Sequence, residues 1–181
     1  MAKPSSKINP LEFQEDMLGG PDKEKITPES VKSAVADHVQ DRARRLHEKY
    51  GSNIDYSVLL KILSDRDAVR FPVTIAFDSS RLEPGMFAVA EPVERKEPED
   101  EEEAEYREYE EAADNFVVVV HEYFKDKLDL LPPMVLYHLV TINYGDMATS
   151  NDAEVFGSGV LGMDQEVYYS QLCDLADQIT S

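Results

Sequence analysis

Five consecutive apolar residues, Phe116–Val120, constrain the fold of this 181-residue chain more than any other feature. A run without polar alternation is typical of a strand buried on both faces, and therefore of the centre of a sheet. Residues 73–78 and 86–90 are β-branched or alternate apolar and polar side chains, which predicts two further strands. We expect these two strands to pair with each other as an antiparallel hairpin, because the turn signal Pro84-Gly85 lies between them.

Helical periodicity surrounds the predicted strands. Apolar residues recur at spacings of three and four over 28–50, and this pattern begins at the cap Thr27 and ends at Gly51. Further helices are predicted over 56–64 and over 134–144, and the second of these is apolar almost all round. A short helix interrupted by glycines is predicted from 151, and a last helix from 164. The predicted fold class is α+β, with a small, mainly antiparallel three-stranded sheet packed with N-terminal and C-terminal helices.

The domain organisation follows from composition. Residues 1–26 are expected to form a short helix and a linker that is partly flexible, because so short a helix is unstable alone in water. Residues 27–181 are expected to form a single α+β domain. An acidic insertion at 94–114 separates the second and third strands, and the sequence leaves open whether it is helical or disordered.

The net charge of −19 is unevenly distributed. Residues 1–70 contain 12 basic and 12 acidic residues, whereas residues 91–114 contain three and 13. Residues 115–181 contain two and ten, and no Lys or Arg follows Lys127. The basic residues that crowd the end of the predicted helix 28–50 either complement its dipole or pair with the acidic C-terminal part. The acidic regions themselves are most simply interpreted as solvated surface.

This charge narrows the classes of partner. It argues against direct binding to nucleic-acid phosphates, which depends on cationic side chains, and against binding to an anionic membrane surface. A basic protein is the partner expected for residues 94–114, and a second copy of the chain is a further candidate. No secretory segment or run of about 18 apolar residues is present, and one cysteine excludes an intramolecular disulfide. A cytoplasmic protein is therefore expected.

Two histidines are the candidates for chemistry. His121-Glu122 follows the most buried strand, where a histidine and a carboxylate could transfer a proton or bind a metal. The segment lacks the second histidine of the zinc motif His-Glu-x-x-His. The alternative interpretation is a surface pair at a strand end.

His138 lies in the most apolar helix. It is interpreted either as a core histidine bonded to a carbonyl or an acid, or as a general base or metal ligand. Together with His121 and a carboxylate such as Asp146, Asp152 or Glu154, it would form a set that suits zinc or iron. Nothing in the spacing requires these groups to converge.

Two further features have a simpler structural interpretation. Gly157–Gly162 matches Gly-x-Gly-x-x-Gly, but it does not follow a strand, and no acid lies about 20 residues beyond it, as the dinucleotide fingerprint requires. We interpret these glycines as positions that let helices pack closely. Cys173 is interpreted as buried filler.

Two hypotheses of function result. The first is a non-enzymatic acidic cytoplasmic interaction or regulatory module without a cofactor, because no catalytic constellation is complete. The alternative is a metal-dependent hydrolase with a diverged metallopeptidase-like fold, using His121, His138 and a nearby carboxylate. A small-molecule pocket between the sheet and the buried helix is a third hypothesis.

Overall fold

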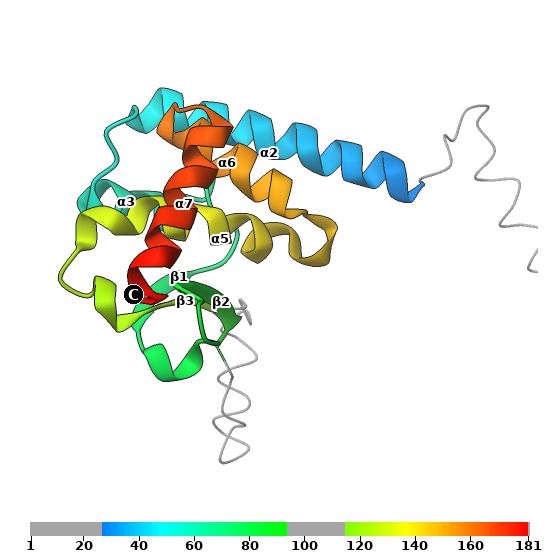
Figure 1. Cartoon of the computed structure of the whole chain (residues 1–181). Coiled ribbons are helices and arrows are strands. Elements are labelled where there is room, and N and C mark those ends of the chain that lie inside the picture. The colour runs from blue at the N-terminus through cyan, green and yellow to red at the C-terminus, as the bar shows by residue number, and fades with distance from the viewer. Residues whose placement is uncertain (1–26, 94–114, 181) are drawn as a thin grey trace, which may run out of the picture.

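The computed structural model of this chain describes residues 27–93 and 115–180. The predicted helix and linker of residues 1–26 and the acidic residues 94–114 lie outside them. Within the described residues there are five α-helices, three strands and four single-turn 3₁₀ helices (Figure 1). The helices and strands are α2 (Pro28–Tyr50), α3 (Tyr56–Leu63), β1 (Val73–Phe77), β2 (Ala88–Pro92), β3 (Phe116–Val120), α5 (Leu131–Tyr144), α6 (Ser150–Leu161) and α7 (Gln165–Thr180).

Reciprocal caps fix the starts of two helices. The Thr27 hydroxyl accepts a hydrogen bond from the Ser30 N–H at 3.1 Å, and the Ser30 hydroxyl accepts one from the Thr27 N–H at 2.9 Å. Thr149 and Asp152 form the same arrangement at the start of α6. The predicted start of α2 is confirmed. The expectation that glycines interrupt α6 is wrong, because the helix continues through them to Leu161.

The sheet has the order β1-β3-β2, so the apolar run Phe116–Val120 is the central strand, as predicted. β3 pairs with β1 in parallel and with β2 antiparallel. The α+β class with a small three-stranded sheet is therefore confirmed, but the expected hairpin between the first two strands is wrong. The apolar β3 takes the position with a neighbour on each side, and β2, which contains Pro92, takes an edge, where a missing N–H costs no ladder bond.

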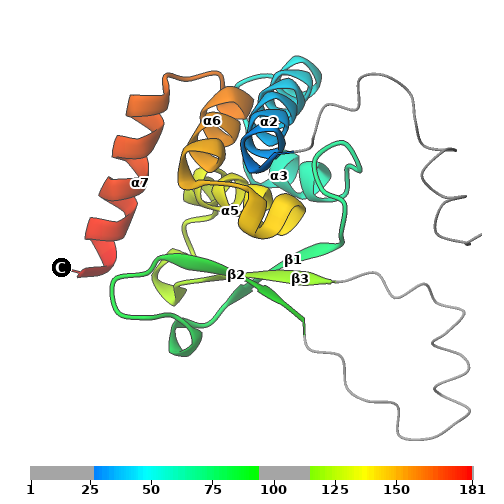
Figure 2. The same cartoon turned by 90° about the vertical axis from the view of Figure 1, so that its right-hand side faces the viewer.

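The ends of the acidic insertion meet at one end of the sheet. The Val93 N–H, just after β2, donates to the Asn115 carbonyl, just before β3, at 2.8 Å. The two described residues that flank the acidic insertion, Val93 and Asn115, are therefore neighbours in space. In Figure 2 they lie at the end of the sheet opposite the C-terminus of α7.

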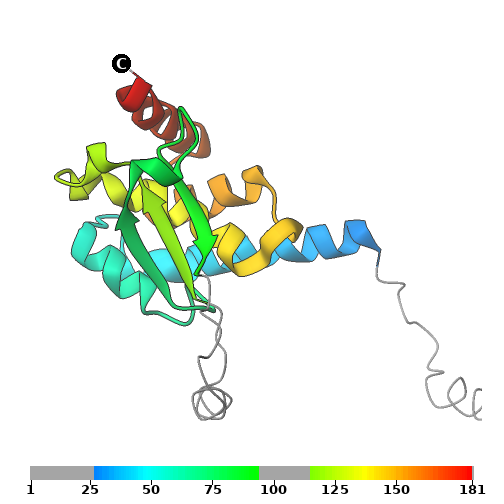
Figure 3. The ribbon, with the colours of Figure 1, turned by 90° about the horizontal axis from the view of Figure 1, so that it is seen from below.

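The helices pack on one face of the sheet (Figures 2 and 3). α5 contacts β2 and β3, and α2 and α6 pack together beyond it. Val118 and Val120 of β3 point into the common apolar core, which also contains eight buried residues of α5: Leu131, Met134, Val135, Leu136, Leu139, Val140, Ile142 and Tyr144. The prediction that this helix is buried almost all round is confirmed.

On the other face of the sheet, Val117 and Val119 are also buried. Arg81, which lies just after β1, forms an ion pair with Glu91 of β2. Because β3 lies between these two strands, the pair joins both edges of the sheet across the central strand. Among residues 27–93 and 115–180, no helix has the length and apolarity needed to cross a membrane.

Candidate functional site

His121 and Glu122 lie where β3 ends. The His121 N–H donates to the Phe87 carbonyl at 2.8 Å, and its Nδ1 atom accepts a hydrogen bond from the Tyr123 N–H at 3.2 Å. The ring thereby caps the 3₁₀ helix Glu122–Phe124. The Glu122 N–H donates to the Ser79 hydroxyl at 2.9 Å, and its side chain is exposed. The imidazole of His121 therefore has a local role in ending the strand.

His138 is half-buried as a residue and lies beside two aromatic rings, those of Phe87 and Tyr137. Its Nε2 atom is buried and has no hydrogen-bond partner in the described part of the chain. Burial lowers the pKa of His138 from 6.5 to about 4, because the positive form would lose its hydration. The imidazole is therefore neutral near pH 7.

The candidate carboxylates have separate environments. Asp146 is exposed in the 3₁₀ helix Gly145–Met147, and Asp152 caps the start of α6. Glu154 accepts a hydrogen bond from Gln165. Across the described ranges, no three His, Cys, Asp or Glu side chains form a group that could hold a metal ion. The structure thus does not bring His121 and His138 together with a carboxylate as a ligand set.

The three glycines of the Gly-x-Gly-x-x-Gly match each have a close neighbour. A Cβ atom at Gly157 would lie 2.1 Å from the Tyr168 hydroxyl oxygen, and one at Gly159 would lie 2.9 Å from the Ala43 Cβ. Gly162 ends α6 with φ of 68°, in the left-handed region, where His47 packs against it. The motif therefore serves close packing of α6 against α2 and α7, as the sequence indicated.

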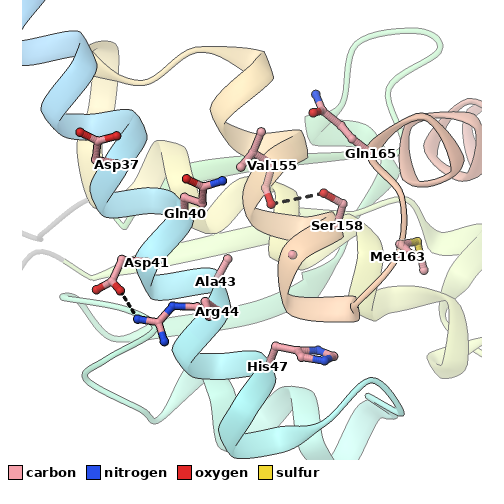
Figure 4. A pocket seen from close by; sticks show the side chains of 11 residues that line it. Asp37, Gln40, Asp41, Ala43, Arg44, His47, Val155, Ser158, Met163 and Gln165 are labelled. Atoms are coloured by element: carbon pink, nitrogen blue, oxygen red, sulfur yellow. Dashed lines mark hydrogen bonds and ion pairs between the residues drawn. The ribbon is translucent and has the colours of Figure 1, made fainter.

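A groove of about 690 Å³ lies between α2 and the end of α6 (Figure 4). On the α2 side, Arg44 forms an ion pair with Asp41 at 2.5 Å. The His47 Nδ1–H donates to the Val160 carbonyl at 3.0 Å. These polar groups already have partners within the protein. Sequence reasoning placed a pocket between the sheet and α5 and did not single out this groove.

A second cleft, of about 320 Å³, lies between α6 and α7 and is lined by Glu154, Gln165, Glu166 and Tyr169. The Gln165 side-chain amide donates to Glu154 and to Asn151, each at 3.0 Å, and so holds the Glu154 carboxylate in place. Tyr169 is 56% exposed. We call these four lining residues the acidic cleft.

The charge of Glu154 affects two nearby tyrosines. Burial and then the Glu154 charge raise the pKa of Tyr137. The pKa of Tyr169 is raised first by its hydrogen bond with Cys173 and also by the Glu154 charge. Cys173 is exposed, so its interpretation as buried filler is wrong.

Carboxylates beside a tyrosine face are suited to a cationic side chain, because ion pairing and a cation–π contact act together. Neither Glu154 nor Glu166 forms an ion pair with Lys or Arg in the described part of the chain. Of the four lining residues, the sequence singled out only Glu154, and for metal binding. The available signal was the absence of any Lys or Arg after Lys127.

Comparison with known proteins gives no relative: no family model, no curated protein and no solved structure matches this chain.

Proposed function

We propose that the protein is a non-enzymatic cytoplasmic interaction module that binds a basic segment of a partner protein in the acidic cleft between α6 and α7. The observation that carries this proposal is the pairing of two carboxylates, Glu154 and Glu166, with an exposed tyrosine, Tyr169, around one cavity. Both carboxylates are free of basic partners in the described ranges.

The geometry supports recognition of a lysine or arginine side chain. Glu154 is held by Gln165, so its carboxylate needs little ordering on binding. Tyr169 offers an aromatic surface at low entropic cost. Cations near a ring and a carboxylate gain about 0.5–1 kcal/mol from each contact at exposed sites. Stable binding would need several such contacts along α7. The exposed side of this helix also carries an apolar side chain, Val167.

Residues 94–114 provide a second anionic region for the same class of partner. They contain 12 acidic and three basic residues. The residues that flank them, Val93 and Asn115, are joined by a backbone hydrogen bond. The acidic cleft is formed by residues of α6 and of the start of α7, which are separate in sequence from residues 94–114, so the two regions can be changed and tested separately.

We expect the double substitution Glu154→Gln and Glu166→Gln to weaken binding of a fluorescent peptide rich in Lys and Arg by about tenfold, since two lost contacts of about 0.7 kcal/mol each give that factor. Fluorescence anisotropy of the full chain at low and moderate salt measures the effect. The loss should be larger at low salt, because salt screens exposed charges.

The matched control removes two other exposed acids, Glu83→Gln and Asp126→Asn, and so changes the net charge equally. It should leave the affinity within about twofold of the original. An equal loss in both double variants would mean that only net charge attracts the peptide, and would remove the acidic cleft as the site. If deleting residues 94–114 alone abolished binding, that region would be the site instead.

A further inference from the structure

The basic residues in the second half of α2 fall into two groups. Arg44 and Arg45 form ion pairs with Asp41 of the same helix, at 2.5 Å each, and Lys49 pairs with Asp65 at 2.6 Å. One interpretation of the sequence was that these basic residues pair with the acidic C-terminal part. Arg44, Arg45 and Lys49 do not, because their partners are Asp41 and Asp65. Arg42 is different, because its Nη1 atom is buried and has no hydrogen-bond partner in the part of the chain that the structure describes.

An unpartnered buried guanidinium nitrogen is unfavourable. Leaving a charged donor without an acceptor costs on the order of 1–3 kcal/mol or more. Arg42 is half-buried as a residue, so part of its side chain faces solvent. An anion that reaches this side chain would offset its charge and supply acceptors.

A second arginine, Arg70, lies in the segment between α3 and β1. The Asn143 side chain accepts a hydrogen bond from the Arg70 N–H at 2.9 Å and donates one to the Ala68 carbonyl at 2.8 Å. The Arg70 guanidinium carbon lies 5.5 Å from the centre of the Tyr144 ring. The side chain is exposed and forms no ion pair with a carboxylate of the described residues.

His38 links the two arginines: it lies one helical turn before Arg42 on α2, and it contacts Tyr144, whose ring Arg70 also faces. Its Nδ1 atom lies 2.9 Å from the Tyr144 hydroxyl, and the two rings meet edge to face. The pKa of His38 is lowered by burial first and then by the positive charges of Arg42, Arg70 and Arg45. Asp41 opposes this effect, but it is already bound by two other arginines.

The C-terminal end of α5 offsets part of the positive charge of the two arginines. The helix ends at Tyr144, where its last carbonyl groups carry about half a negative charge, which stabilises nearby cations. Two full positive charges exceed that amount. A bound anion would balance the remaining positive charge.

We infer that Arg42 and Arg70 form a binding site for one phosphate group, beside His38 and Tyr144. Arginine presents paired donors that match phosphate oxygens, and a phosphate group with a charge near −2 balances two arginines. The site would hold a single phosphate group, free or as a monoester. It differs from a nucleic-acid surface, which needs a row of cations along successive phosphates.

The test follows the His38 ring by NMR during titration of the full chain with inorganic phosphate at constant ionic strength. We expect a saturable change in the His38 signal and a rise in its pKa, because the bound anion offsets the arginine charges. Arg42→Gln and Arg70→Gln should each weaken binding about tenfold or more. Arg44→Gln is the matched control, since Arg44 already has partners, and should change the affinity less than about twofold.

Several results would overturn the site. They are a His38 signal that does not respond to phosphate, an equal response to acetate, and an Arg44→Gln variant as weak as the other two. Because Arg70 is exposed, Arg70→Gln leaves the core intact and remains informative even if Arg42→Gln fails to fold. Methyl phosphate distinguishes the source: tighter binding than inorganic phosphate assigns a monoester, and weaker binding assigns the free ion.

Discussion

Replacing Gly157 with alanine should lower the free energy of unfolding by about 3 kcal/mol, although alanine is the better helix former by about 1 kcal/mol. The added Cβ would lie 2.1 Å from the Tyr168 hydroxyl oxygen and 2.2 Å from the ring carbon that bears it. Tyr168 is fully buried, and its hydroxyl donates to the Pro133 carbonyl at 2.6 Å. The ring cannot move aside without breaking this bond, so overpacking and a lost buried hydrogen bond both contribute. Urea unfolding measures the change.

Gly159→Ala is the matched control, because Gly159 lies on the same helix and meets only the Ala43 Cβ, at 2.9 Å. It should cost less, about 1 to 2 kcal/mol, because only one contact is formed, but the Ala43 Cβ is fixed to the α2 backbone and the two helices must separate slightly. A second control removes the obstacle: in a Tyr168→Leu background, Gly157→Ala should have little further effect. If Gly157→Ala alone left the stability unchanged or raised it, then α7 would be free to move away from α6, and the packing role of Gly157 would be wrong.

Local signals in the sequence were sufficient for the bounds of α2 and for the central strand. The cap at Thr27 and the periodic apolar residues gave the bounds of α2, and the unbroken apolar run gave β3. Both signals depend on residues that are close together in the sequence, so they can be recognised without knowledge of the tertiary fold. The strand order could not be derived in this way. The neighbour rule favoured pairing of β1 with β2, but burial of β3 on both faces favoured placing it between them.

The candidate sites depend on contacts that no local pattern records. The acidic cleft unites Glu154 with Tyr169 of the next helix, and the phosphate site unites Arg42 with Arg70 across 28 positions of the chain. Sequence reasoning found the uneven charge that lies behind both sites. It could not separate arginines that have carboxylate partners from arginines that lack them, because that distinction arises only when the helices pack.

Lowering the pH from 7.5 to 4 should cost the folded protein about 3 kcal/mol through His138 alone. Burial holds the pKa of this imidazole at about 4, below its ordinary value of 6.5. Between these two values the unfolded chain takes up a proton that the folded protein excludes, so acid favours unfolding. The contribution of His138 to stability is therefore complete above about pH 7 and falls until about pH 4. Urea unfolding at pH 7.5 and pH 4.5 covers most of this range.

His138→Leu isolates the effect from that of the many carboxylates that also titrate in acid. Leucine fills the space between Phe87 and Tyr137 without the buried, unpartnered Nε2 atom, so it should not lower stability at pH 7.5 by more than about 1 kcal/mol. The variant should lose between about 2 and 3 kcal/mol less than the original protein on acidification. His38, whose pKa is also lowered, contributes equally to both proteins and cancels in the comparison. Equal acid sensitivity of His138→Leu and the original protein would mean that the imidazole accepts a proton in the folded state, and that the Nε2 atom finds an acceptor there.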